Sequence, residues 1–258
     1  PPDFFRLYSE VSGLDAFTIA MLAVNGIVGI TAQPHMISMC ATGNTERAGR
    51  IGQTYGSLVK RLCTIGWAFT GLIVAALVVQ RGVVLTDGEM AFGYACKTLL
   101  VPGLTGLMVA CVLAANMAAC SNFMVNSGAL FTNNFYKKYV KKETADRQLL
   151  WIGRFSGFGL TLLGVLFALT VRNVLHGFLF TETIAAFMGI TVLGGILWKR
   201  ANRTGAFLSV IISFGLYYAL NVLDTGRLTL VYKWKPEPFG LAMAAAFAAF
   251  FLFSALTR

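Results

Sequence analysis

The order of apolar and polar positions predicts a chain built of membrane-spanning helices. Seven runs are apolar almost throughout, and each is long enough to cross about 30 Å of bilayer hydrocarbon. They cover residues 15–39, 62–80, 100–134, 149–171, 177–198, 205–222 and 237–256. A membrane β-barrel would alternate apolar and polar residues in segments of about ten. We therefore predict an all-α, polytopic helical membrane protein in which residues 1–258 form a single transmembrane domain.

Three segments modify this pattern. Residues 41–61 are polar with helical spacing, which predicts a short interfacial helix before the second span. Residues 82–99 contain an Asp87-Gly88 turn and are expected to hold another short helix. Residues 98–136 carry no charge, and a straight helix of that length would measure about 58 Å. The third span is therefore expected to continue beyond the bilayer.

Composition excludes several classes of protein. Hydrophobic residues make up 57% of the chain and charged residues only 12%, about half the share of a soluble domain. A soluble enzyme, a disordered chain and a collagen-like fibre are excluded. The net charge of +10 is explained by cytoplasmic loops and not by nucleic acid, because Lys and Arg accumulate on the cytoplasmic side of membrane proteins.

The distribution of charge also predicts the orientation in a cell membrane. Fourteen of the 21 Lys and Arg residues follow the first, third, fifth and seventh spans. The positive-inside rule then places the N-terminus outside and the C-terminus in the cytoplasm. The sequence Asn202-Arg203-Thr204 matches a glycosylation acceptor, but it lies on the predicted cytoplasmic side and is expected to stay unmodified.

The sequence contains no motif typical of a catalytic or cofactor-binding site. The five cysteines show neither CxxC nor metal-ligand spacing, and no Ser/His/Asp set or Gly-rich phosphate loop is present. We predict that the protein is not an enzyme and holds no organic cofactor or structural metal. The sequence starts Pro1-Pro2-Asp3 without an initiator methionine, so it is interpreted as part of a longer protein.

Polar residues inside the spans are the candidates for function, since they are costly in hydrocarbon. The first span contains Asn25, Gly26, Gly29, Gln33 and Pro34. This pattern predicts a discontinuous helix, broken between about Asn25 and Ala32, whose free backbone groups bind solute or ion. A proline kink with small-residue packing is the alternative.

Two further polar residues lie in other spans. Asn116 sits among small residues of the third span and is expected to hydrogen-bond to a neighbouring helix, although close packing is the alternative. Glu182, in the fifth span, is a candidate gate or coupling carboxylate. It could equally face an aqueous vestibule.

Three motifs resemble the sodium:solute symporter family, which includes proline, pantothenate and sugar symporters. They are Ala32-Gln33-Pro34-His35-Met36-Ile37, the segment from Ser127 to Lys137, and Gly195-Ile196-Leu197-Trp198-Lys199-Arg200 followed by Gly205-Ala206. The third is similar to a specific Gly-x-x-Trp-Lys-Arg signature of that family. Their order and spacing also match.

The resemblance implies a LeuT-like fold of two inverted five-helix repeats. The first five spans would be the second repeat, and the last two would be accessory helices. The first repeat would lie in N-terminal helices outside this sequence, which become the expected partners of the chain together with the bilayer and a small solute. Candidate substrate-binding residues are Asn25, Gly29, Gln33, Asn116 and Glu182.

The candidate sodium site departs from the family pattern. The resemblance implies sodium ligands at Ala115, Ala118 and Ala119, where the last two positions carry hydroxyl residues in the family. Sodium is a hard cation that needs oxygen ligands, by the reasoning that applies to calcium and magnesium. Only Ser121 and backbone carbonyls remain nearby. Sodium is therefore the candidate coupling ion at a degenerate site.

Two functions follow from these residues. The first is a secondary active transporter that moves a small organic solute by alternating access. The second is a transporter-like sensor or regulatory membrane domain that binds solute without coupled transport, which the missing hydroxyls favour.

Overall fold

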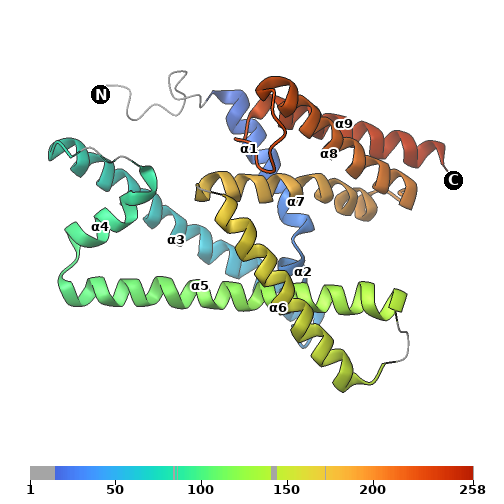
Figure 1. Ribbon diagram of the computed structural model, residues 1–258, viewed down its shortest axis with the longest axis horizontal. Helices are drawn as coiled ribbons and strands as arrows, with labels where there is room; N and C mark the ends of the chain where they lie inside the picture. Colours follow the sequence, from blue (N-terminus) through green and yellow to red (C-terminus); the bar gives the residue numbers. More distant parts are fainter. Residues whose placement is uncertain (1–14, 84, 86, 141–143, 172, 258) are drawn as a thin grey trace. The chain divides into compact units, whose positions relative to one another are not determined.

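The computed structural model describes residues 15–83, 85, 87–140, 144–171 and 173–257. Regular structure within these ranges is entirely helical (Figure 1). Contacts cluster into two compact units, one made of residues 1–37 and 168–258 and the other of Ser38–Phe167. Five charged residues used to orient the chain, Arg6, Lys141, Lys142, Arg172 and Arg258, lie outside the described residues.

The predicted spans are confirmed as helices. The last four correspond, within three residues at each end, to α6 (Asp146–Thr170), α7 (Val174–Leu197), α8 (Arg203–Thr225) and α9 (Pro236–Leu256). Among the described residues, six helices are long and apolar enough to cross a membrane, and a bent pair at the start of the chain makes a seventh. The protein is a polytopic helical membrane protein.

The expected separation between an interfacial helix at residues 41–61 and a span at 62–80 is wrong. One helix, α3 (Glu46–Gln80), covers 35 residues without a break. Thr45 begins it by accepting a hydrogen bond from the backbone N of Ala48 at 3.1 Å, as an N-cap residue does. No proline follows before Gln80, so nothing in the sequence ends the polar part of the helix.

The third span is longer than the bilayer, as predicted. Helix α5 (Pro102–Leu130) continues directly into η4 (Phe131–Val140), a π-helical stretch of 10 residues. Pro102 fits the first turn of α5 because its missing N–H would have no partner there. The short helix expected within residues 82–99 is confirmed as α4 (Ala91–Leu99).

Glycines bring α5 and α6 together in the second unit. A Cβ built on Gly128 would lie 2.4 Å from the carbonyl oxygen of Gly153, and one on Gly157 would lie 2.8 Å from that of Met124. Thr132 is buried at the same crossing and donates to the carbonyl of Gly128 at 2.7 Å. Small residues allow such an approach where lipid offers no hydrophobic driving force.

The first unit packs α7, α8 and α9 around an aromatic centre. Phe187 of α7 is fully buried, and its ring lies 5.4–5.9 Å from the rings of Phe214, Tyr217 and Phe239. Helices α8 and α9 lie side by side (Figure 1), and the buried Ser209 hydroxyl donates to the carbonyl of Ala246 at 2.8 Å. These contacts hold together α7 and α9, the two helices against which α1 packs.

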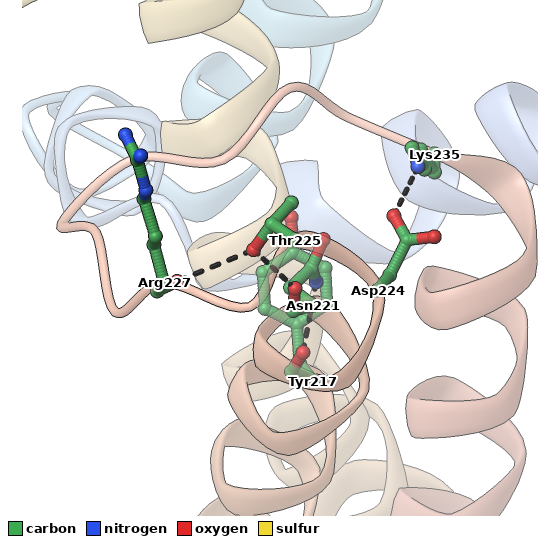
Figure 2. A network of polar contacts seen from close by, with 6 residues as sticks. All are labelled: Tyr217, Asn221, Asp224, Thr225, Arg227 and Lys235. Carbon is green, nitrogen blue, oxygen red and sulfur yellow. Dashed lines mark hydrogen bonds and ion pairs between the residues drawn. The ribbon is translucent and has the colours of Figure 1, made fainter.

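Polar contacts order the loop between α8 and α9. At the end of α8, Thr225 donates to the carbonyls of Asn221 at 2.6 Å and Arg227 at 3.2 Å, and Asp224 pairs with Lys235 across the loop (Figure 2). Gly226 ends the helix in a left-handed conformation, with φ of 67°. The loop is therefore held to the ends of both helices.

Asn202 holds the other end of the same helix pair. Its Oδ1 accepts from the backbone N of Gly205 at 2.8 Å, which caps α8. Its Nδ2 donates to Oγ1 of Thr257 at 2.9 Å and to the carbonyl of Thr257. The nitrogen that would carry a glycan is already engaged in helix packing.

We expect no glycan at Asn202 when the protein is made in a eukaryotic cell. The side-chain amide is engaged, and the charge distribution predicts that it lies on the cytoplasmic side. Mobility on gels before and after peptide:N-glycosidase treatment measures this. A control variant carries an acceptor sequence on a long Gly/Ser insertion after Gly226, in the predicted outer loop, and should be glycosylated. Glycan at Asn202, or none at the insertion, would contradict the predicted orientation.

Candidate functional site

The first span is a broken helix. Helix α1 (Ala16–Gly29) gives way to a 3-10 turn, η2 (Ile30–Ala32), and the chain then bends by 50° into α2 (Pro34–Ala41). Pro34 has no N–H and disfavours a helical residue before it, which explains the extended conformation of Gln33. The discontinuity is confirmed, but it begins at Ile30. Asn25 and Gly26 still lie within regular helix.

Helix α7 packs closely against the end of α1. A Cβ built on Gly189 would lie 2.1 Å from the carbonyl oxygen of Val28. A Cβ on Gly29 would lie 3.1 Å from the carbonyl oxygen of Glu182 and 3.2 Å from its Oε2. Both glycines are buried. The broken end of α1 therefore meets α7 almost backbone to backbone, at the turn that carries Glu182.

A hydrogen bond between two predicted site residues crosses this contact. Nε2 of Gln33 donates to Oε1 of Glu182 at 2.9 Å, and both residues are half-buried. They are 149 positions apart in the chain. The carboxylate thus ties the non-helical link between α1 and α2 to α7. A hydrogen bond to a charged acceptor is stronger than one between neutral groups.

Asn25 lies on the same face of α1. It precedes Gly29 by four residues, which is about one helical turn. Asn25 is 2% exposed, and its Oδ1 has no hydrogen-bond partner in the structure. Buried polar atoms are normally satisfied. The structure therefore brings Gly29, Gln33 and Glu182 together at one helix–helix contact and buries Asn25 one turn earlier on α1.

The remaining predicted residues lie in the other unit, on α5. Nδ2 of Asn116 donates to the carbonyl of Val112 in its own helix at 3.0 Å, instead of reaching a neighbouring helix as expected. Ser121 likewise donates to Met117 at 2.8 Å. Ala115, Ala118 and Ala119 are exposed and offer no side-chain oxygen. The three alanine side chains therefore supply no oxygen ligand for sodium.

Sequence reasoning missed Gly189, which sets how closely α1 and α7 approach. The signal was present as Ala185 and Gly189, two small residues four positions apart on one helix face, a pattern typical of close packing in membranes. A cluster of three His, Cys, Asp or Glu residues that could hold a metal ion is absent from the described residues.

Comparison with known proteins identifies the family. A family model of the sodium:solute symporters matches residues 3–213. The chain is 27% identical to the high-affinity proline transporter PutP of Bacillus subtilis, over 100% of this chain and 52% of that protein. It is 28% identical to the osmoregulated proline transporter OpuE of the same organism, over 84% of this chain and 44% of that protein.

A third relative differs in the solute it carries. The sodium/pantothenate symporter of Haemophilus influenzae is 26% identical over 86% of this chain and 46% of that protein. The chain thus spans about half the length of the curated relatives it matches. No solved structure matches it. These relatives are transporters and not enzymes. Together with the match to the family model, they show that the chain belongs to the sodium:solute symporter family.

Proposed function

We propose that the protein is a secondary active transporter that moves a small organic solute by alternating access through a LeuT-like fold. The observation that carries this proposal is the broken helix α1–η2–α2, held against α7 by Gln33 and Glu182. Interrupted helices at the contact between two spans are typical of solute and ion sites in transporters. Membership of the sodium:solute symporter family supports a sodium-coupled solute transporter as the class.

The proposal gives a role in transport to residues of α1, α7 and α5. The face of α1 from Asn25 to Gln33 contacts the solute, and Glu182 of α7 gates or couples its passage. Asn116 of α5 is a further candidate for contact with the solute. The C-terminus is cytoplasmic, in accord with the charge distribution. Proline and pantothenate, which two of the relatives are named for, are the first solutes to test.

The proposal is tested by uptake into proteoliposomes with the protein expressed from its full reading frame. Gln33→Leu leaves Glu182 without its donor, so we expect solute uptake to fall about tenfold or more, as loss of a hydrogen bond to a charged group does. The same substitution at the exposed Gln148 of α6 should leave uptake unchanged. Equal uptake by both variants would contradict a role for this pair.

A second function is favoured by one observation. Ala118 and Ala119 stand where the family resemblance implies hydroxyl ligands for sodium, and both are exposed on α5. A protein without a working ion site binds solute but does not accumulate it, as a sensor does. Saturable binding in detergent combined with no uptake, under sodium or proton gradients, would support the sensor and contradict the transporter.

A further inference from the structure

A groove lies between α5–η4 and α6, beside the glycine crossing of these two membrane-spanning segments. Its volume is about 580 Å³, which is within the range of ligand sites in proteins. Most of its wall is apolar, and the side chains that form this part are Met124, Val125, Ala129, Leu149 and Leu150. An apolar groove between membrane helices suits the acyl chain of a lipid.

Two opposite charges lie at the same groove. Asp146 and Arg154 line it from α6, and both are exposed. Neither forms an ion pair with any residue that the structure describes. The guanidinium of Arg154 lies 5.2 Å from the ring centre of Trp151, and an arginine stacked on a ring keeps N–H groups at its edge for donation. Each charge can therefore take a partner from outside the chain.

The two charges lie at different depths. Asp146 begins α6, and Arg154 follows about two turns later, roughly 12 Å further along the helix axis. Trp151 is exposed close to Arg154, and exposed tryptophans are typical of the level of lipid headgroups. Met124 lies deeper, since its carbonyl oxygen approaches Gly157. From the membrane surface inward, the groove thus offers a carboxylate, then a guanidinium, then apolar side chains.

We propose that this groove binds a molecule of phosphatidylethanolamine from the adjacent leaflet. In this lipid the ammonium is outermost, the phosphate lies beneath it and the acyl chains lie deepest, which is the order of the complementary groups along the groove. The ammonium donates to Asp146, and Arg154 donates to the phosphate. An acyl chain packs along Met124 and Val125. The order is the same whichever side of the membrane α6 begins on.

Asp146 makes the proposed site selective for this headgroup. Phosphatidylcholine has the same charges, but its quaternary ammonium carries no N–H to donate to a carboxylate. Phosphatidylglycerol has a net negative charge, which Asp146 repels. Lys137 and Lys138 of η4 do not line the groove, and they attract anionic lipids to the surface without selecting this site. Phosphatidylethanolamine is therefore the headgroup that fits both charges of the groove.

Binding of lipids with equal chains tests this selectivity. The protein is expressed from its full reading frame and purified in detergent, and palmitoyl-oleoyl lipids are titrated by native mass spectrometry. Phosphatidylethanolamine and phosphatidylcholine have no net charge and differ only in N-methylation. We expect phosphatidylethanolamine to bind about fivefold more tightly, which is the upper range for a charge pair at an exposed position. The readout is lipid binding, so it does not depend on transport.

Variants with matched controls locate the lipid. Asp146→Asn should give phosphatidylethanolamine the affinity of phosphatidylcholine, whereas Glu237→Gln, in the first turn of α9, should keep the preference. Arg154→Gln should weaken both lipids about fivefold. Arg147→Gln, exposed on the same helix but outside the groove, should not. Ala129→Phe fills part of the apolar wall and should weaken both lipids through their chains.

Four outcomes would overturn the proposal. The first is equal affinity for phosphatidylethanolamine and phosphatidylcholine in the unmodified protein. The second is a preference that survives Asp146→Asn, and the third is an equal effect of Arg154→Gln and Arg147→Gln. The fourth is tighter binding of phosphatidylglycerol that is lost in Arg154→Gln, since the groove would then hold an anionic lipid. Lipid binding that ignores all three groove variants would show that another part of the protein covers the groove.

Discussion

Replacing Gly189 by alanine is expected to destabilise the first unit by about 3 kcal/mol. The new Cβ would lie 2.1 Å from the carbonyl oxygen of Val28, and a backbone atom cannot move aside as the end of a side chain can. Helix α1 must therefore shift away from α7. Such a loss lowers the midpoint of thermal unfolding by about 6–12 °C in a protein of this size, which is measured on the purified protein in detergent.

Two other glycines provide comparisons. Gly195→Ala, six residues later on α7, meets no atom within 4 Å and should leave the unfolding midpoint unchanged or slightly raised, since alanine favours helix. Gly29→Ala is expected to have a smaller effect on stability than Gly189→Ala, because its closest contacts are 3.1 and 3.2 Å. It should still disturb the carboxylate of Glu182 and reduce uptake. Equal stability of Gly189→Ala and Gly195→Ala would refute the close packing of α1 on α7.

Solute uptake is expected to depend only weakly on sodium. Ala118 and Ala119 remove two side-chain oxygens from the ligand set that the family resemblance implies. If each ligand contributes about 1.5–3 kcal/mol, as hydrogen bonds to charged groups do, sodium binding is weakened more than about a hundredfold. The measurement compares uptake in sodium and potassium buffers. Strong sodium dependence in the unmodified protein would show that the ion is held elsewhere.

The matched gain-of-function variant is Ala118→Ser combined with Ala119→Ser. Both positions are exposed on α5, so the hydroxyls fit without clashing inside the described chain. We expect sodium dependence to appear or rise in this double variant. Ser substitutions at Ala114 and Ala110 on the same helix are the control, and should leave sodium dependence unchanged. A double variant that behaves as the control does would contradict a sodium site on this face of α5.

The spans and the broken first helix could be predicted because local physics decides them. In a bilayer every backbone group must be hydrogen-bonded within its own segment, so an apolar run of about 20 residues becomes a helix whatever surrounds it. Helices α6 to α9 illustrate this. Pro34 lacks an N–H, so the interruption before it was also readable. The residue at which the interruption starts could not be predicted. Glycines weaken a helix in water, but they are tolerated in a membrane helix that packs against a neighbour.

The length of α3 and the partner of Asn116 were predicted wrongly for a related reason. Polar composition suggested a separate surface helix at residues 41–61, but polarity alone does not end a helix, and α3 runs on to Gln80. Asn116 was expected to reach a neighbour because an unpaired amide is costly in hydrocarbon. The carbonyl of Val112, one turn earlier in its own helix, satisfies it instead. A hydrogen bond within the same helix thus competes with one to a neighbouring helix. The pattern of polar and apolar residues does not show which of the two forms.

The sequence by itself thus determined the membrane class, the helices and the residues whose chemistry is unusual in a membrane. The tertiary structure decided which of them meet. Gln33 and Glu182 are 149 positions apart, and their contact depends on how α1 and α7 are rotated and how closely they approach. Gly189 sets that approach, and the same packing buries Asn25 with an unpaired oxygen. Which residues of α1 and α7 meet depends on how the side chains of both helices fit together. The sequence of one helix alone does not determine this fit.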